Sequence, residues 1–334
     1  MEIFRKMSFA DSTGDAIPFY HEGKYHIFSL TSPPGTTVYP ERLRTTWSHS
    51  VSEDLVHWKE LPTALYPGEG EEPDASGVWT GSVIYGEGQF HAFYTGYCLT
   101  AEFQQTICHA TSEDGITWKK DTANPVITPI TELYEKLDWR DPYVFYNEED
   151  ENYWILISAR RLDMPITRRG CIVLYRSKDL KNWSYYGPIY SPGHTNCPEC
   201  PEMYRMGNHW YLSYSRFSEF VNTIYRVSES PFGPWRKPKK DGIGGRRFYA
   251  AKSMQNEEGR RFYFGWAHDR AQQSDTGEWY WGGTFCVPHE VVPSENGELD
   301  VKLPREYEQI FGRKTEWEYL PVLGDAKVYG KNTI

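Results

Sequence analysis

The feature that most constrains this chain is an internal repeat with a period of roughly sixty residues. Five strand-like segments alternate aromatic or aliphatic residues with polar ones, and the first reads Lys24-Tyr-His-Ile-Phe. The other four begin at Gln89, Asn152, Asn208 and Arg261. Repeated units of this kind, with no long helical period, predict an all-β fold built as a five-bladed β-propeller. A β-sandwich would not require such a repeat.

A turn motif after the outer strand divides the chain in the same way. In four units a Ser is followed by an acidic or polar stretch that ends in Trp, over residues 52–58, 112–118, 177–183 and 228–235. The fifth unit instead runs through Pro288-His-Glu-Val-Val-Pro and Asn296-Gly-Glu-Leu-Asp. We therefore predict a catalytic propeller domain over residues 1–310 and a short C-terminal extension over residues 311–334. Because a ring of repeats must close, we also predict that a strand within residues 2–9 pairs with the last blade.

Three acidic residues recur near the start of the units. Asp15 lies eight residues before Gly23, as Glu199 lies eight residues before Gly207. The segment Asp141-Pro-Tyr-Val-Phe-Tyr repeats the pattern that follows Asp15. In a propeller the innermost strands line the central channel, so we interpret the three acids as sharing one structural position that faces one funnel. Convergent carboxyls are the groups that glycosidic bond cleavage needs.

The same offset in the other two units gives Trp79 or Thr80 and Ala251 or Lys252. A single acid at this place would be read as a solvated carboxylate at a strand end, because charged residues are mostly exposed. Three acids in register favour a site instead. We expect Asp15, rather than Asp11, to point into the funnel.

The composition limits the class of partner. Aromatic residues make up 16% of the chain, which fits both strand packing and the stacking of sugar rings. The net charge of -10 argues against a nucleic-acid partner, which would need a basic patch. No apolar run reaches membrane-spanning length and the N-terminus has no signal-peptide core, so we expect no membrane partner and a cytoplasmic location.

The six cysteines do not have the pattern of a disulfide framework. Cys197-Pro-Glu-Cys200 has the spacing of a redox pair or half of a zinc site, but the chain has no second such pair. We therefore expect neither a metal nor a cofactor.

Several motifs together resemble a known family. They are Trp47-Ser-His-Ser-Val-Ser-Glu-Asp-Leu-Val-His-Trp58, Trp79-Thr-Gly-Ser82, Arg140-Asp-Pro142, Glu199-Cys-Pro201 and Gly265-Trp266. In this order they resemble glycoside hydrolase family 32, the β-fructosidases. The resemblance implies a retaining mechanism acting on a fructoside or related furanoside. It also implies that Asp15 is the nucleophile, Asp141 the transition-state stabiliser and Glu199 the general acid/base.

The chain departs from that family in three places. Its opening, Asp11-Ser-Thr-Gly-Asp15-Ala-Ile-Pro18, is closer to that of glycoside hydrolase family 43, the arabinosidases and xylosidases, which invert. The Gln that normally follows the first outer strand is missing, since the chain reads Phe28-Ser-Leu-Thr31. The residues after the fifth unit are too few for the C-terminal β-sandwich of family 32. The alternatives are therefore an inverting arabinofuranosidase or xylosidase and a propeller that binds sugar without cleaving it.

The acids must also differ in their protonation states. A glycosidase needs one protonated carboxyl and one ionised carboxyl near neutral pH. We expect Arg140 to keep Asp141 ionised, and the longer Glu199 to reach the leaving oxygen. For a retaining enzyme we predict a separation of roughly 5 to 5.5 Å between the carboxyls of Asp15 and Glu199.

Six further residues are candidates for substrate binding. Arg140 and Asp141 could together hold sugar hydroxyls, and three tryptophans could form an apolar wall. His49 and Ser82 could donate hydrogen bonds to ring hydroxyls. The tryptophans are Trp47, Trp79 and Trp266, for which packing in the core is the competing interpretation.

One rival function depends on basic residues. Five-bladed glycoside phosphorylases hold phosphate with basic side chains beside a single acid, and this chain has arginines at 160, 161, 168 and 169. Three acids in register argue against that function. The expected partner is a small-molecule oligosaccharide or fructoside, and self-association into a homo-oligomer is left open.

Overall fold

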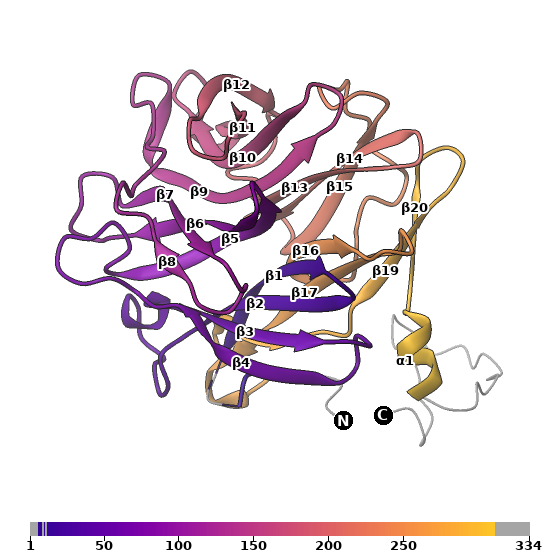
Figure 1. The fold of residues 1–334 in the computed structure, drawn as a ribbon, viewed down its shortest axis with the longest axis horizontal. Helices are drawn as coiled ribbons and strands as arrows, with labels where there is room; N and C mark the ends of the chain where they lie inside the picture. The colour runs from indigo at the N-terminus through magenta and orange to yellow at the C-terminus, as the bar shows by residue number, and fades with distance from the viewer. Residues whose placement is uncertain (1–5, 9, 11, 311–334) are drawn as a thin grey trace.

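Five groups of antiparallel strands follow one another around a central axis in the computed structural model, which describes residues 6–8, 10 and 12–310 (Figure 1). The first blade holds β1 (Thr13–His21), β2 (Lys24–Thr31), β3 (Thr46–Ser52) and β4 (Trp58–Leu65). The second holds β5 (Gly77–Gly86), β6 (Gln89–Tyr97), β7 (Gln105–Ser112) and β8 (Lys119–Lys120). The third holds β9 (Tyr134–Asn147), β10 (Asn152–Arg161), β11 (Gly170–Ser177) and β12 (Ser184–Tyr190).

The last two blades are less regular. The fourth holds β13 (Glu199–Met206), β14 (His209–Arg216) and β15 (Asn222–Ser228). The fifth holds β16 (Tyr249–Gln255) and β17 (Arg261–Arg270), then a third strand in two pieces, β18 (Trp279–Phe285) and β19 (His289–Pro293), and finally β20 (Leu299–Lys302). The short helices are η1 (Glu41–Leu43), η2 (Ile166–Arg168), η3 (Ala271–Gln273) and α1 (Arg305–Ile310).

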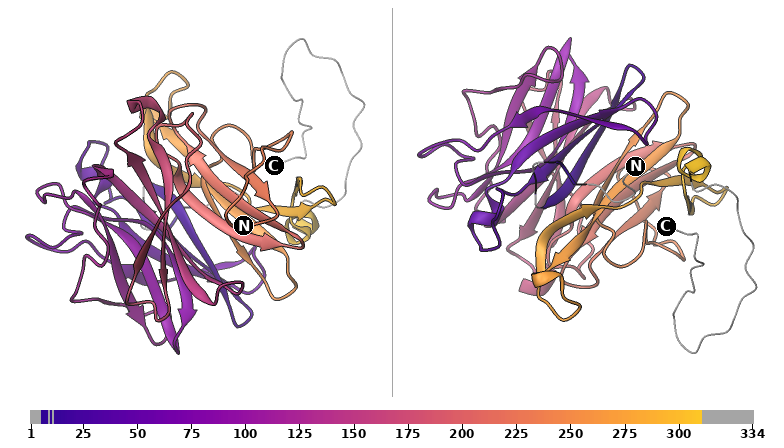
Figure 2. Two further views of the ribbon diagram at one scale, coloured as in Figure 1. Left: turned by 90° about the horizontal axis from the view of Figure 1, so that it is seen from above. Right: turned by 90° about the horizontal axis from the view of Figure 1, so that it is seen from below.

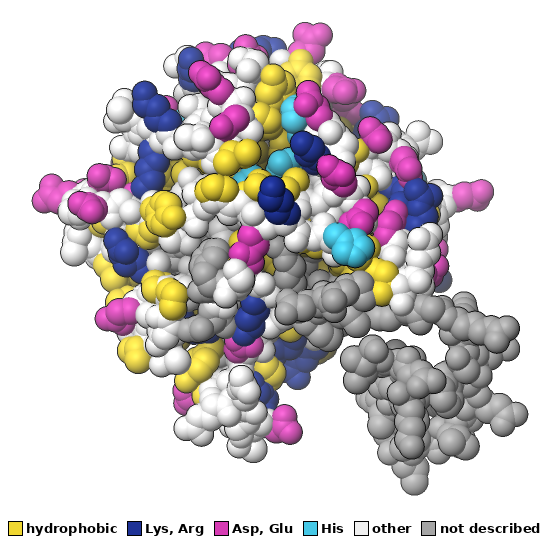
Figure 3. Space-filling view, turned by 60° about the horizontal axis from the view of Figure 1, so that its bottom comes forward, with side chains coloured by type: hydrophobic (Ala, Val, Ile, Leu, Met, Phe, Trp, Pro, Cys, Tyr) yellow, Lys and Arg dark blue, Asp and Glu magenta, His cyan; other side chains and the backbone are white. Residues whose placement is uncertain are grey.

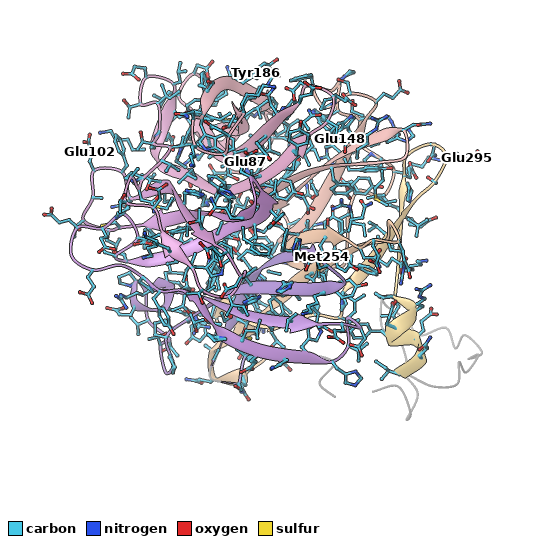
Figure 4. The ribbon with its side chains drawn as sticks, in the orientation of Figure 1. Glu87, Glu102, Glu148, Tyr186, Met254 and Glu295 are labelled. Carbon is cyan, nitrogen blue, oxygen red and sulfur yellow. The ribbon has the colours of Figure 1, made fainter. Side chains whose placement is uncertain are left out.

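This arrangement confirms the predicted all-β, five-bladed propeller. The innermost strands β1, β5, β9, β13 and β16 each contact the next, and β16 contacts β1. Five clusters of buried hydrophobic residues lie between neighbouring blades, so the core is divided into wedges around the axis. Figure 4 shows side chains filling the spaces between the sheets, with Glu102 and Glu295 at the outer edge. No β-sandwich follows β20 within the residues that the structure describes.

The repeated turn has a simple chemical basis. In three blades an Asp two residues after the Ser accepts hydrogen bonds from the backbone N–H groups two and three residues further on. This is an Asx turn, which fixes the connection between the third and fourth strands. The three aspartates are Asp54, Asp114 and Asp179.

The ring closes through elements at both ends of the described chain. Thr13 of β1 pairs with Gly283 of β18, so the first blade hydrogen-bonds to the last. Helix α1, at the edge of the molecule in Figures 1 and 2, adds a second link, because the Tyr307 hydroxyl donates to the Leu55 carbonyl at 3.0 Å. Most of the segment predicted to close the ring, residues 2–9, lies outside the described residues, and its described part, residues 6–8, is not in a strand. Asp11 and the predicted extension, residues 311–334, also lie outside them.

Candidate active site

All five innermost strands carry a β-bulge at the same place. In each, an advance of three residues along the innermost strand lies opposite an advance of two residues along the neighbouring strand. The innermost strand therefore has one extra residue. The bulges lie between Thr13 and Ala16, Val78 and Gly81, Arg140 and Tyr143, Glu199 and Glu202, and Tyr249 and Lys252. A bulge bends the strand and re-aims side chains, and here it does so at one end of the axis five times.

Each of the three acids lies in the bulge of its own strand, but each occupies a different position in that bulge. Glu199 is the first residue of its bulge, Asp141 the second and Asp15 the third. The expectation of a single shared position is therefore wrong. Counting from Gly23 and Gly207 misled it by two positions. β1 has one more residue than β13 between the bulge and the hairpin turn, and Gly23 is the second residue of its turn whereas Gly207 is the first.

The second position of three bulges has an unusual backbone. Asp141, Cys200 and Ala250 have φ angles of 58°, 49° and 46°. A positive φ is sparsely populated for residues other than glycine and tends to persist where surrounding structure holds it, often at functional sites. At Asp141 the holding contacts are visible: its backbone N–H donates to Thr95 Oγ1 at 2.8 Å, and its Oδ2 accepts from the Cys200 N–H at 2.8 Å.

One pocket of about 390 Å³ contains all three acids. This volume lies at the lower end of the range typical of small-molecule sites. The acids lie on β1, β9 and β13, and the pocket wall also includes aromatic side chains from four of the five blades. Those aromatic residues are Tyr39, Trp79, Phe217, Tyr249, Trp279, Tyr280 and Trp281.

Asp15 is the most isolated of the three carboxyls. It is 8% exposed, and its Oδ1 accepts a hydrogen bond from Trp266 Nε1 at 2.9 Å. The Cys200 thiol, a weak donor, lies 3.8 Å from its Oδ2. Burial, and after it the charge of Asp141, raise the pKa of Asp15 from 3.8 to about 7, although Lys252 and Trp266 oppose the change.

Glu199 receives stronger donors. Arg140 Nη2 donates to its Oε1 at 2.9 Å, and the Tyr249 hydroxyl donates to its Oε2. Burial raises the pKa of Glu199, but Arg140 and Tyr249 stabilise the carboxylate and oppose that rise. The pKa of both carboxyls is therefore raised, and only Glu199 has two strong donors to its carboxylate form.

Arg140 forms the expected ion pair with Asp141 and pairs with two further carboxylates. Its Nε is 3.7 Å from Asp141 Oδ2, whereas its two terminal nitrogens bind Glu199 and Asp138. Asp138 in turn binds Arg160 at 3.0 Å. Arg140 therefore orients Glu199 more directly than it orients Asp141.

The arginines of the rival phosphorylase function are largely neutralised. Arg160 binds Glu135 and Asp138, and Arg169 binds Glu135. Arg161 binds Asp163 at the surface. These pairs leave little of the free positive charge that a phosphate would require.

A buried lysine crosses the channel beside the acids. Lys252 of β16 is 2% exposed, and its Nζ donates to Thr80 Oγ1 of β5 at 2.8 Å and to the Gly81 carbonyl. The second and fifth blades, whose bulges carry no acid, are thus linked across the axis. The positive charge of Lys252 partly balances the acids.

Four of the six residues proposed to bind substrate do not line the pocket. Trp47, fully buried, donates its Nε1 to the Trp79 carbonyl. His49 packs against Phe28 with ring centroids 4.0 Å apart, and Ser82 bonds to backbone groups of β9. Trp266 is fully buried and reaches the site only through its hydrogen bond to Asp15. Sequence patterns do not separate wall from core, because both use aromatic side chains on strands.

Arg140 and Trp79 do line the pocket, as predicted. Trp79 is stacked on Tyr97 with centroids 4.0 Å apart and is anchored by a hydrogen bond from Nε1 to the Leu43 carbonyl. The sequence analysis missed Tyr249, and it missed the wall formed by Trp279-Tyr280-Trp281. Three consecutive aromatic residues were a usable signal for that wall.

The pocket contains a thiol but no metal-binding cluster. All six cysteines are free, and Cys200 faces Asp15 instead of Cys197. Within residues 6–8, 10 and 12–310, no group of three or more His, Cys, Asp or Glu side chains could hold a metal ion. None of the helices described is long and apolar enough to span a bilayer.

The pocket contains a fourth carboxyl, that of Asp138, besides the three predicted acids. A five-bladed propeller with clustered carboxyls and an aromatic wall at one end of its axis defines the class of propellers that glycoside hydrolases use. Comparison with protein families agrees with this class. The sequence model described as "Glycosyl hydrolases family 32 N-terminal domain" matches residues 15–302, so the chain belongs to glycosyl hydrolase family 32.

Relatives of known name come from several organisms. Raffinose invertase of Escherichia coli is 29% identical over 316 residues, which cover 87% of this chain and 62% of that protein. Levanase of Bacillus subtilis is 29% identical over 337 residues, which cover 91% of this chain and 46% of that protein. The structure of fructan 1-exohydrolase IIa from Cichorium intybus is similar in fold, with a TM-score of 0.75 at 24% identity, covering 92% of this chain and 61% of that one. The chain thus spans about three fifths or less of these relatives.

Proposed function

We propose that this protein is a retaining β-fructofuranosidase that hydrolyses a small fructoside. The observation that carries the proposal is the convergence of Asp15, Asp141 and Glu199 in one pocket, with Glu199 oriented by Arg140 and Tyr249. The names of the relatives support the substrate class, because they include an invertase and a levanase. Two structures of similar fold were determined with 1-kestose and with sucrose bound.

In the proposed mechanism, Asp15 attacks the anomeric carbon while Glu199 protonates the leaving oxygen. Asp141 holds sugar hydroxyls and stabilises the oxocarbenium-like charge. Water then enters, Glu199 removes its proton, and the bond between sugar and Asp15 breaks. The product keeps the anomeric configuration of the substrate.

This mechanism needs Glu199 protonated and Asp15 ionised. Burial raises the pKa of both carboxyls, which favours the protonated form that Glu199 needs. Positive charge that develops on the sugar beside Asp15 favours the ionised form of Asp15.

Turnover of sucrose, inulin, levan and nitrophenyl furanosides tests the proposal. Glu199→Gln should stop turnover, whereas Glu148→Gln, which removes an exposed carboxylate that is labelled in Figure 4 and does not line the pocket, should leave it unchanged. If none of these substrates is cleaved, or if Glu199→Gln remains active, the protein is not such an enzyme. A propeller that binds sugar without cleaving it would show unchanged affinity in Glu199→Gln.

Proton NMR of fresh hydrolysis distinguishes retention from inversion before mutarotation. An inverted product would favour the family 43-like alternative, with Asp15 acting as a general base. The separation of the Asp15 and Glu199 carboxyls, predicted at roughly 5 to 5.5 Å, belongs to the same test. The six free cysteines also support the proposed cytoplasmic location, since thiols persist in a reducing compartment.

A further inference from the structure

Lys252 is a buried cation that has no carboxylate partner. Its side chain is 2% exposed, and its Nζ donates to the Thr80 hydroxyl at 2.8 Å and to the Gly81 carbonyl. Among the described residues, no carboxylate forms an ion pair with it. Burial of an ammonium group is costly unless an opposite charge compensates it. A hydroxyl and a carbonyl carry no full charge, so the compensating charge lies further away.

Asp15 is the carboxyl near Lys252 that lacks a cation. Three neighbouring carboxyls around the channel are each within ion-pair distance of an arginine. They are Asp141 at 3.7 Å, Glu199 at 2.9 Å and Glu202 at 3.2 Å. Asp15 has no such ion pair within the part of the chain that the structure describes. The channel therefore holds one unpaired cation and one unpaired carboxyl.

These two groups lie on strands that contact each other where the ring closes. Lys252 is the last residue of the bulge in β16, Asp15 lies in the bulge of β1, and β16 contacts β1. The charge of Lys252 acts on Asp15 from this position and lowers its pKa, against the larger effects of burial and Asp141. Two charges in a protein interior interact well beyond hydrogen-bond distance, so this coupling needs no direct contact.

Lys252 lies behind the pocket and not in its wall. Asp15 and Thr80 line the pocket, but Lys252 does not. A substrate in the pocket would therefore touch Asp15 and Thr80 and leave the ammonium group covered. Lys252 is placed to act on the reaction through Asp15, as a positioning residue.

The contacts of Asp15 leave one of its oxygens free to react. Its Oδ1 accepts from Trp266 Nε1 at 2.9 Å, whereas its Oδ2 has only the weak donor of the Cys200 thiol, at 3.8 Å. A direct ion pair at Oδ2 would occupy the oxygen that attacks the sugar. A cation at a distance favours the carboxylate and leaves Oδ2 free.

Other titratable groups near Asp15 do not supply this positive charge. Burial raises the pKa of Cys200 and Tyr249 and lowers that of His268 to about 3, so these three groups are neutral near pH 7. The two arginines concerned, Arg140 and Arg261, are bound by other carboxylates. Besides Asp15, the titratable groups that line the pocket are Tyr39, Asp138, Arg140, Asp141, Glu199, Cys200, Tyr249, His268 and Tyr280, and those behind it are Glu202, Lys252 and Arg261.

Charges on the surface are a weaker source. On the face that Figure 3 presents, Lys and Arg side chains are interspersed with Asp and Glu side chains. Exposed charges of mixed sign partly cancel, and salt screens them. A buried ammonium group is screened much less, so the influence of Lys252 on Asp15 should persist in salt.

We propose that Lys252 is the counter-charge that keeps Asp15 ionised for attack through Oδ2, without forming an ion pair with it. The attack on a sugar rests on the proposed function, but the coupling between the two charges does not. The two parts are therefore tested separately.

Titration of Asp15 tests the coupling without turnover. Carbon NMR of protein labelled at its Asp carboxyl carbons follows Asp15, whose signal is identified by its absence from Asp15→Asn. In Lys252→Gln the pKa of Asp15 should rise by at least about one pH unit. Lys302→Gln, which removes a charge from a surface pair with Glu290, should leave that pKa unchanged. The same pKa of Asp15 in Lys252→Gln and in the wild type would overturn the proposal.

A second variant separates charge from hydrogen bonding. Gln at position 252 can still donate to Thr80 and Gly81, whereas Met cannot, and neither is charged. Lys252→Gln and Lys252→Met should therefore raise the pKa of Asp15 alike. A raised pKa in Lys252→Met alone would show that the hydrogen bonds matter and the charge does not. If Lys252→Gln does not fold at pH 8, Asp15→Asn in the same chain should restore folding, and failure to do so would contradict the coupling.

Kinetics then connect the coupling to the reaction. The acid limb of the pH profile of kcat/KM reports the ionisation of the nucleophile in the free enzyme. Lys252→Gln should move this limb upwards by about one pH unit, which lowers kcat/KM roughly tenfold at pH 6 and less at higher pH. The shift should persist in about 0.5 M NaCl.

The outcomes distinguish this proposal from the proposed function. An equal loss of kcat/KM at every pH would indicate a purely structural role for Lys252 and would overturn its assignment to the reaction. If no fructoside is cleaved but the pKa of Asp15 rises in Lys252→Gln, the proposed function fails and the coupling stands.

Discussion

At the scale of single residues, the environment of each carboxyl decides its proton affinity. Asp15 has one N–H donor and a thiol, whereas Glu199 has a guanidinium and a phenol. The charge that Asp15 carries after ionisation is therefore less well stabilised than that of Glu199.

Asp15→Asn should abolish turnover and stabilise the folded protein above neutral pH. The pKa of Asp15 rises from 3.8 to about 7 on folding, so its favourable contribution is present below pH 3.8 and is lost as the pH rises through about 7. Asn stays neutral throughout. Because the pKa difference corresponds to about 4 kcal/mol at most, we expect a gain of roughly 2 to 4 kcal/mol at pH 8 and almost none at pH 4. Denaturant unfolding at both pH values measures it.

Asp114→Ala provides a control of opposite sign. Backbone N–H groups lower the pKa of Asp114 to about 2, so its contribution is present above pH 3.8 and is lost as the pH falls towards 2. This variant should be less stable than the wild type at pH 8. A loss of stability in Asp15→Asn at pH 8 would contradict our account of Asp15.

Tyr249→Phe should move the pH dependence of kcat. The lost hydroxyl stabilises the carboxylate form of Glu199, so its removal should raise the pKa of Glu199 and shift the alkaline limb of the profile upwards. We expect a shift of about one pH unit and a fall in kcat of roughly tenfold. Tyr39→Phe is the matched control, because the Tyr39 hydroxyl accepts a hydrogen bond from the Trp281 N–H instead of touching a carboxyl. Identical profiles for the two variants would refute the role of Tyr249.

At the scale of elements, the repeated bulge is the device that builds the site. An extra residue on each innermost strand turns successive side chains towards the channel, so residues at different bulge positions can converge. The bulge also brings backbones close together. A Cβ added at Gly81 would lie 1.9 Å from the Phe93 carbonyl oxygen, which belongs to the neighbouring strand β6.

Gly81→Ala should therefore destabilise the fold strongly. Relief of the clash needs movement of backbone in β5 or β6, for which we expect a loss of about 2 to 4 kcal/mol in the free energy of unfolding. Gly245→Ala is the control, since an added Cβ there meets no atom within 4 Å. Its effect should stay within roughly 0.5 kcal/mol. Equal midpoints of urea unfolding for the two variants would contradict the close approach of β5 and β6 at the bulge.

At the scale of the whole molecule, closure of the ring joins the last described elements to the first blade. Tyr307 of α1 is 7% exposed and packs in the cluster between the fifth and first blades, where its hydroxyl binds the Leu55 carbonyl. Arg260 ties the same helix to the fifth blade through Glu306 and Glu290. The helix thus fastens two blades that are distant in sequence.

Tyr307→Ala should weaken this closure by roughly 2 to 4 kcal/mol, because it leaves a cavity and an unsatisfied carbonyl. Tyr307→Phe should lose only about 1 kcal/mol, the size of one hydrogen bond. Urea unfolding measures both, and Tyr146→Ala, which truncates an exposed tyrosine, serves as the control. If Tyr307→Ala is as stable as Tyr146→Ala, α1 does not fasten the ring.

The sequence by itself determined the blade count, the β class, the family and the three acids. These follow from local patterns, since strand periodicity, the Ser-Asp turn and the motifs around Asp141 and Glu199 are short-range features of the chain. It also named three acids that lie in one pocket, although it assigned them one shared position and missed Asp138 beside them.

Only the tertiary structure decided which groups surround those acids. Tyr249 reaches Glu199, Trp266 reaches Asp15 and Lys252 reaches Thr80 from blades that sequence distance does not relate. Proton affinity depends on burial and on charges a few ångströms away, and neither is visible along the chain. The proton affinities of the acids and the wall of the pocket are therefore properties of the closed ring.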